Sequence, residues 1–373
     1  MRTTDLGSLT RPFGAGEDPE LAFPQAIGVN VPEVETLYRE IFNDLDDTNY
    51  GVSWWAPHPG TSRRILISHY LLECVRGIRQ NLSEAGLHLL EAIDNWDKES
   101  DFLADCVNVG PHGQISVNVP PRKCPNDDLA RRLATLHAVG FFRSVVAALD
   151  CLGASVIGVL ALPKNIQYAD LKGAQEALRI ATHPIQSTFL GMLDRAISEA
   201  GPLGWVEWVT DFRNMATHRG RRININQVIP RQPHLLGPDG KVIPRAMTAE
   251  HLPSDPCRSQ IEAFIDNTRP PVLTEHAEAT MRGTLDSSIS VVRKLCPELV
   301  TAWQTRRSTP SLLNQPKANW PGDYPSRSTQ FNGYQPGSLP FDPAMWISHR
   351  DIQRQFKSAA LSDECRELWS TFD

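Results

Sequence analysis

Residues 205–222 read WVEWVTDFRNMATHRGRR, and the rest of the chain can be interpreted around this stretch. Its first half places apolar residues three and four positions apart, the spacing of an amphipathic helix: Trp205, Trp208, Val209 and Phe212. Its second half gathers polar and basic residues within ten positions: Arg213, Asn214, His218, Arg219, Arg221 and Arg222. Gly220 can adopt the left-handed conformation that often ends a helix. The stretch therefore predicts a helix that buries one face and ends in a basic cluster.

Helical periodicity recurs on both sides of this stretch. Long apolar stripes at helical spacing predict helices over 61–96, 126–162 and 273–306. Shorter helices are expected at 31–45, 168–182, 185–199 and 347–371. The chain is therefore predicted to be mainly α, as a bundle of long helices.

Two segments favour strands instead. QISVNV at 114–119 alternates apolar and polar residues, as a short strand does. RININQVIP at 222–230 alternates as well, and HLLGPDGKVIP at 234–244 predicts two short strands around a Gly-Pro-Asp-Gly turn. We expect a small β insertion at about 222–256 on the helical frame.

The expected organisation has three parts. Residues 1–60 form an N-terminal arm and a short helix packed on the core, and 61–306 form the helical domain with its β insertion. Residues 307–373 form an extended strap, rich in proline and aromatic residues, followed by a helix.

Composition narrows the function classes. Hydrophobic residues make up 41% of the 373 and charged residues 21%, which suits a globular protein with a sizeable core. A net charge of -6 argues against a nucleic-acid-binding coat over the whole surface but permits a local basic site. The seven cysteines are widely spaced, which favours reduced thiols. The sequence shows neither a signal-peptide pattern nor an uninterrupted apolar run long enough to span a membrane, and it therefore predicts a cytoplasmic protein without a membrane partner.

Other kinds of site find little support. The histidines show no metal-binding spacing and no phosphate-binding glycine loop is present, so no metal and no cofactor are predicted. Gly-Ala-Ser-Val-Ile-Gly at 153–158 lies inside a predicted helix, where small residues favour close helix packing. His137 is expected to be a core or surface side chain. A loosely structured, solvated charge cluster is expected from four acidic residues: Asp94, Asp97, Glu99 and Asp101.

The R-N-x-x-x-H pattern of Arg213, Asn214 and His218 resembles the signature of the HEPN superfamily, whose members are α-helical bundles and in many cases metal-independent ribonucleases. The resemblance implies RNA as substrate and a homodimer in which two motifs face each other across the two-fold axis. It implies 2′,3′-cyclic phosphate ends on the product. It further implies a role in toxin–antitoxin systems or antiviral defence, with a regulatory or antitoxin partner protein.

The chemistry of these residue types agrees with that reading. Histidine can accept or donate a proton near neutral pH, and arginine supplies a permanent charge with donors suited to phosphate oxygens. Asn214 and His218 lie four residues apart and therefore on one helix face. Charge alone gives a phosphate-holding, RNA-binding role to three further residues: Arg219, Arg221 and Arg222.

Two other interpretations remain open. His218 and Arg219 could cap the end of a helix, where cations are favoured by the helix dipole, and Arg213 could pair with Asp211 or Glu207. The chain would then be a scaffold subunit of a larger complex. Alternatively, the fold and the basic cluster could bind RNA or nucleotides without catalysis.

Overall fold

A computed structural model describes residues 24–45, 61–109, 115–117, 128–164, 169–218, 225–230, 246–257 and 272–309. These residues divide between two compact units. Unit 1 takes residues from Met1–Val31, Arg79–Ala148 and Asp194–Val292, and unit 2 from Pro32–Ile78, Leu149–Leu193 and Arg293–Asp373. The longest helices contribute residues to both units.

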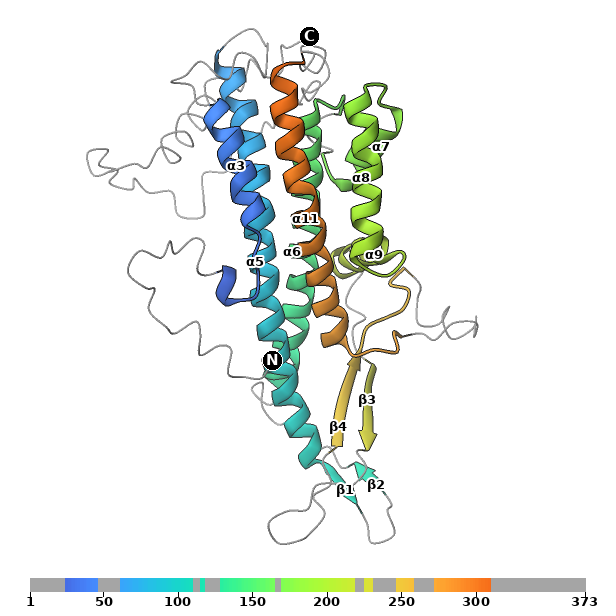
Figure 1. Ribbon diagram of the computed structural model, residues 1–373. Coiled ribbons are helices and arrows are strands. Elements are labelled where there is room, and N and C mark those ends of the chain that lie inside the picture. The colour runs from blue at the N-terminus through green and yellow to red at the C-terminus, as the bar shows by residue number, and fades with distance from the viewer. Residues whose placement is uncertain are drawn as a thin grey trace, which may run out of the picture. The chain divides into compact units, whose positions relative to one another are not determined.

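The described part of the chain is mainly helical, which confirms the predicted class (Figure 1). Its helices are α3 (Pro32–Leu45), α5 (Thr61–Asp105), α6 (Leu129–Leu160), α7 (Leu171–Ile180), α8 (Pro184–Ala200), α9 (Trp205–His218) and α11 (Ala277–Arg307). The apolar stripe expected in the last long helix is buried throughout, because one residue on each turn faces the core: Leu285, Ile289, Val292, Leu295, Leu299 and Trp303.

Two antiparallel strand pairs accompany the helices. β1 (Val107–Val109) pairs with β2 (Ile115–Val117), so the QISVNV segment contains a strand. β3 (Ile225–Pro230) pairs with β4 (Ala246–His251) over their full lengths. The two strands expected at 234–244 fall wholly among residues 231–245, which lie outside the described residues.

Unit 2 is held together by packing and by buried polar contacts. The indole Nε1 of Trp303 on α11 donates a hydrogen bond to Asp44 Oδ2 on α3 at 2.7 Å. A Cβ added at Gly158 of α6 would lie 2.6 Å from a methyl carbon of Leu71 on α5. The small residues of the 153–158 segment therefore allow close helix packing, as the sequence indicates.

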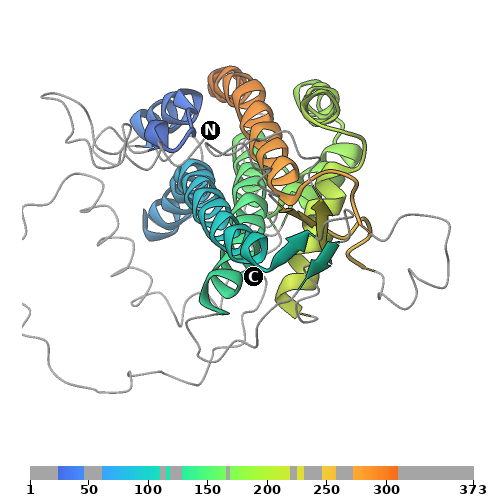
Figure 2. The ribbon, with the colours of Figure 1, turned by 90° about the horizontal axis from the view of Figure 1, so that it is seen from below.

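In unit 1, α5 and α6 run side by side in both views (Figure 1; Figure 2). Phe142 of α6 lies against three aromatic rings, with centroid distances of 5.0, 5.6 and 4.2 Å to Phe141, Trp208 and Phe212 respectively. Since Trp208 and Phe212 belong to α9, this aromatic cluster fixes α9 on α6.

One expectation about α5 is wrong. The sequence predicts that this helix ends near residue 96 and that a loose acidic cluster follows, but α5 continues to Asp105. An ion pair between Asp94 and Lys98, four residues apart, supports the added turns. Glu99 is buried, with only 8% of its surface exposed, and it interacts electrostatically with Arg131 of α6. Contacts with another helix therefore stabilise a segment whose own composition favours a loop.

The remaining predictions concern residues that are only partly described. The strap and the final helix, at 307–373, lie outside the described residues beyond Thr309. In the arm, Ile27 and Val29 are buried, and a Cβ at Gly86 of α5 would lie 3.2 Å from a methyl group of Val29. None of the five cysteines in the described part forms a disulfide.

Candidate functional site

The candidate site lies on α9. A turn with Gly204 at a φ of 80° precedes this helix. The indole Nε1 of Trp205 donates to the carbonyl of Ile197 on α8 at 3.1 Å, and that of Trp208 donates to the carbonyl of Pro253 at 3.1 Å. The tryptophans of the WVEW segment therefore fix the start of α9 at two points, and the motif follows on the same rigid helix.

Each motif residue has a different position on α9. Arg213 is half-buried at the edge of the apolar stripe, and its Nε atom is inaccessible to solvent. Asn214 is exposed. His218 is the last residue of the helix. Because Arg213 and His218 are five residues apart, they project about 140° apart around the helix axis.

The helix register brings Asn214 and His218 onto one face of α9. The residues at 207, 211, 214 and 218 follow the i, i+4, i+7, i+11 spacing of a single face. Two of them are carboxylates, the exposed Glu207 and the half-buried Asp211. By register, position 218 therefore shares a face with an amide and two carboxylates, whereas Arg213 lies about 100° around the axis from Asn214, at the edge of the apolar stripe.

A residue that the sequence interpretation missed lies beside the motif. Arg143 of α6 is exposed, and its Nε donates a hydrogen bond to the hydroxyl Oγ1 of Thr217 at 3.4 Å. Thr217 directly precedes His218, so the fold brings a second arginine to the end of α9. No local pattern could have indicated this, because Arg143 and Thr217 are 74 residues apart.

The other predicted arginines are not described. Arg219, Arg221 and Arg222 belong to 219–224, outside the described residues. Their phosphate-holding role remains a prediction.

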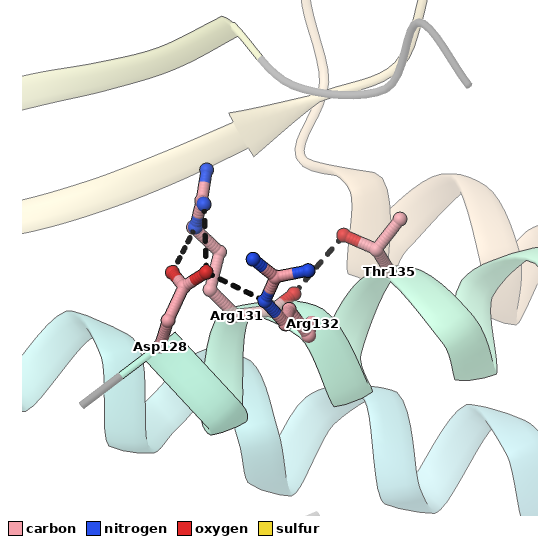
Figure 3. A network of polar contacts seen from close by, with 4 residues as sticks. All are labelled: Asp128, Arg131, Arg132 and Thr135. Carbon is pink, nitrogen blue, oxygen red and sulfur yellow. Dashed lines mark hydrogen bonds and ion pairs between the residues drawn. The ribbon is translucent and has the colours of Figure 1, made fainter. Parts of the chain in front are cut away.

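A second charged cluster lies at the start of α6, also in unit 1 (Figure 3). Asp128 accepts hydrogen bonds from Nε and Nη2 of Arg131 at 2.7 and 3.0 Å, and from Nε of Arg132 at 2.7 Å. These donors, first those of Arg131 and then that of Arg132, lower the pKa of Asp128 to about 2. The carboxylate stays ionised at neutral pH and holds both arginines at the surface.

Among the described residues, no group of three or more histidine, cysteine or acidic side chains is arranged to hold a metal ion. The chain matches no protein-family model, no curated protein and no solved structure in the comparisons made.

One helix of the described part, α6, is long and apolar enough to cross a membrane. Yet 72% of its most apolar window is buried inside the protein. The core of a water-soluble protein produces the same combination.

Proposed function

We propose that the chain is a metal-independent endoribonuclease of the HEPN type, in which Arg213, Asn214 and His218 act on RNA. The observation that carries the proposal is the register of α9, which puts positions 214 and 218 on one face and Arg213 about 100° around the axis from Asn214. In this mechanism the ribose 2′-hydroxyl attacks the adjacent phosphorus, and the protein moves protons and stabilises the negative charge.

The roles follow from the chemistry of each side chain. His218 exchanges the proton of the 2′-hydroxyl or of the leaving 5′-oxygen. Arg213 supplies positive charge to the phosphate oxygens, and the exposed Asn214 orients the phosphate or the imidazole. We add Arg143 as a phosphate-binding residue, because it donates a hydrogen bond to Thr217, the residue that directly precedes His218.

A single protomer does not complete the site in this proposal. Arg213 and His218 project in different directions, about 140° apart, so one pair does not converge on one phosphate. A homodimer would supply a histidine and an arginine from each chain. As in the family that the motif resembles, we place the activity in toxin–antitoxin or antiviral defence in the cytoplasm, under a regulatory or antitoxin partner.

The test is RNA cleavage in the presence of EDTA, with wild type and His218→Ala, Arg213→Lys and Asn214→Ala compared at equal folded concentration. We expect wild type to leave 2′,3′-cyclic phosphate ends and His218→Ala to lose at least about 100-fold in rate, the usual contribution of a general acid or base. Asn214 is exposed, so its replacement should leave stability within about 0.5 kcal/mol while activity falls.

Arg195→Ala serves as the matched control, because Arg195 is an exposed arginine of unit 1 on α8, outside the motif. It should cleave as wild type does. Cleavage that persists unchanged in His218→Ala would contradict the catalytic role.

The alternative is an RNA- or nucleotide-binding module without catalysis. The exposure of Arg143, Arg131 and Arg132 on α6 favours binding of a polyanion. RNA binding that is weakened by Arg143→Ala, without cleavage by any variant, would favour this alternative. If the chain neither binds nor cleaves RNA, the result would favour a scaffold subunit.

A further inference from the structure

Two histidines meet between α5 and α6 in unit 1. Nδ1 of His88 lies 3.0 Å from Nδ1 of His137, and both residues are half-buried. Their ring centroids are 5.3 Å apart. That separation exceeds the nitrogen–nitrogen distance by about two imidazole ring radii, so the two Nδ1 atoms point almost directly at each other.

This head-on arrangement is that of a hydrogen bond rather than of a shared metal ion. Two imidazoles that bind one metal direct their lone pairs to a common point, and their axes therefore meet at about 90–110°. Here the axes are nearly collinear. One Nδ1 must carry a proton and donate the hydrogen bond, and the other must be unprotonated and accept it.

The geometry sets a rule for proton uptake. In the neutral pair, one ring donates from Nδ1 and the other accepts. A first added proton can bind Nε2 of the donor ring, which keeps the hydrogen bond and makes it charge-assisted. A second added proton must occupy the accepting Nδ1. Two N–H groups and two positive charges then face each other at this contact.

The surroundings keep the pair close. A Cβ added at Gly140 of α6 would lie 2.5 Å from Nε2 of His88, so the His88 ring occupies the space that a side chain at position 140 would need. Among the described residues, the charged groups that act on His88 are His137 from α6 and, from α5 itself, Glu84 and Glu91. Burial and, second, the positive charge of His137 lower the pKa of His88, against the opposing effect of the two carboxylates.

We propose that the His88–His137 hydrogen bond is a proton-controlled latch between α5 and α6, closed while the pair carries at most one added proton and opened by the second. The latch depends only on contacts within unit 1, so it holds whether or not the chain cleaves RNA.

A double-mutant cycle tests the latch. His88→Phe, His137→Phe and the double variant remove the hydrogen bond while keeping an aromatic ring at each position, and urea unfolding at pH 8 and pH 5 gives the coupling between the two residues. At pH 8 the coupling should favour folding by roughly two- to tenfold in the unfolding equilibrium constant, the range for one hydrogen bond. At pH 5 it should vanish or change sign. A coupling that is the same at both pH values would overturn the proposal.

A conservative variant separates hydrogen bonding from titration. In His137→Asn the amide keeps a donor and an acceptor near the position of Nδ1 but takes up no proton between pH 8 and pH 5. Its stability should stay within about twofold of wild type at pH 8, and it should lose less stability than wild type at pH 5. Equal losses in the two proteins would count against the latch.

A spectroscopic measurement on the wild-type chain needs no variant. Histidine labelled with ¹⁵N should show a scalar coupling between two Nδ1 atoms across the hydrogen bond at pH 8, and this coupling should disappear as the second proton binds. Two histidines that titrate independently, without such a coupling at any pH, would show that the latch does not exist.

Discussion

At its C-terminal end α6 has a hydrogen-bond partner for each of its last four carbonyl groups, whereas its N-terminal half carries exposed arginines and no acidic residue between positions 129 and 149. The carbonyls of Gly158 and Val159 accept from Nη1 of Arg306 at 2.7 and 2.9 Å. That of Leu160 accepts from Nε2 of Gln186 at 2.7 Å, and the amide of Leu162 donates to the carbonyl of Ile157 at 3.1 Å.

The N-terminal half of α6 belongs to unit 1 and carries most of its ionisable groups where water reaches them. Arg131, Arg132 and Arg143 are exposed, and His137 is half-buried. Each has a hydrogen-bond partner elsewhere in unit 1: Asp128, Thr217 or His88. The C-terminal end of α6 therefore stabilises the fold, while its N-terminal half presents groups that can bind anions or protons.

The largest expected effect is at the C-terminal end. Arg306 is fully buried, and burial lowers its pKa to about 9, so the guanidinium remains charged at neutral pH. Arg306→Met should destabilise the protein by about 3 kcal/mol, because two buried carbonyls lose their donor. Urea unfolding measures the change.

Arg293→Met is the matched control, since Arg293 is an exposed arginine of the same helix, α11, in unit 2. Its effect should stay within about 0.5 kcal/mol. If both variants were equally stable, the buried carbonyls of α6 would not depend on Arg306.

Gly153→Ala should have the next largest effect. A Cβ at this position would lie 2.4 Å from the carbonyl carbon of Asp170 and from the amide nitrogen of Leu171. Because both atoms belong to the backbone, the helices must separate, and overpacking of this kind costs about 2 kcal/mol. The midpoint of urea unfolding should fall accordingly.

The control for this substitution is Gly191→Ala in α8, where a Cβ would meet no atom within 4 Å. That change should stabilise the protein by up to about 1 kcal/mol through helix propensity. A loss of stability in both variants would mean that close packing does not explain the requirement for glycine at 153.

The sequence allowed the helices to be predicted because their apolar spacing is local information. It did not reveal which side of α6 is covered. Leu129 and Leu136 continue the apolar register of that helix, yet they are 47% and 48% exposed. The extension of α5 also escaped prediction, since it depends on contacts such as that of Glu99 with Arg131 rather than on local composition.

For the candidate site, the placement of Arg213, Asn214 and His218 on one helix could be predicted, since they are near neighbours in the chain. Arg143 and the His88–His137 pair could not, because their partners are 74 and 49 residues away. Contacts of that range depend on how the helices pack, and helical periodicity alone does not determine it.

At the N-terminal end of α6, Asp128→Asn should cause a smaller, pH-dependent loss. The pKa of Asp128 is lowered in the folded state, so its contribution is present above the unfolded value of 3.8 and is lost as the pH falls towards about 2. The difference in urea midpoint between wild type and Asp128→Asn should therefore be constant from about pH 8 to 5 and shrink below about pH 4. A difference that grew on acidification would contradict the assignment of these hydrogen bonds.

The smallest expected effect has the opposite sign. Ala161, directly after α6, has a φ of 53°, a left-handed conformation that strains any residue with a Cβ by roughly 1–2 kcal/mol. Glycine avoids this strain but loses about 0.5–1 kcal/mol through its greater freedom in the unfolded chain. Ala161→Gly should therefore stabilise the protein by about 0.5 kcal/mol, whereas Ala279→Gly, at an exposed position inside α11, should destabilise it by about 1 kcal/mol. Opposite signs in parallel urea titrations would show that the end of α6 stores strain despite its complete set of hydrogen bonds, and equal losses would show that it does not.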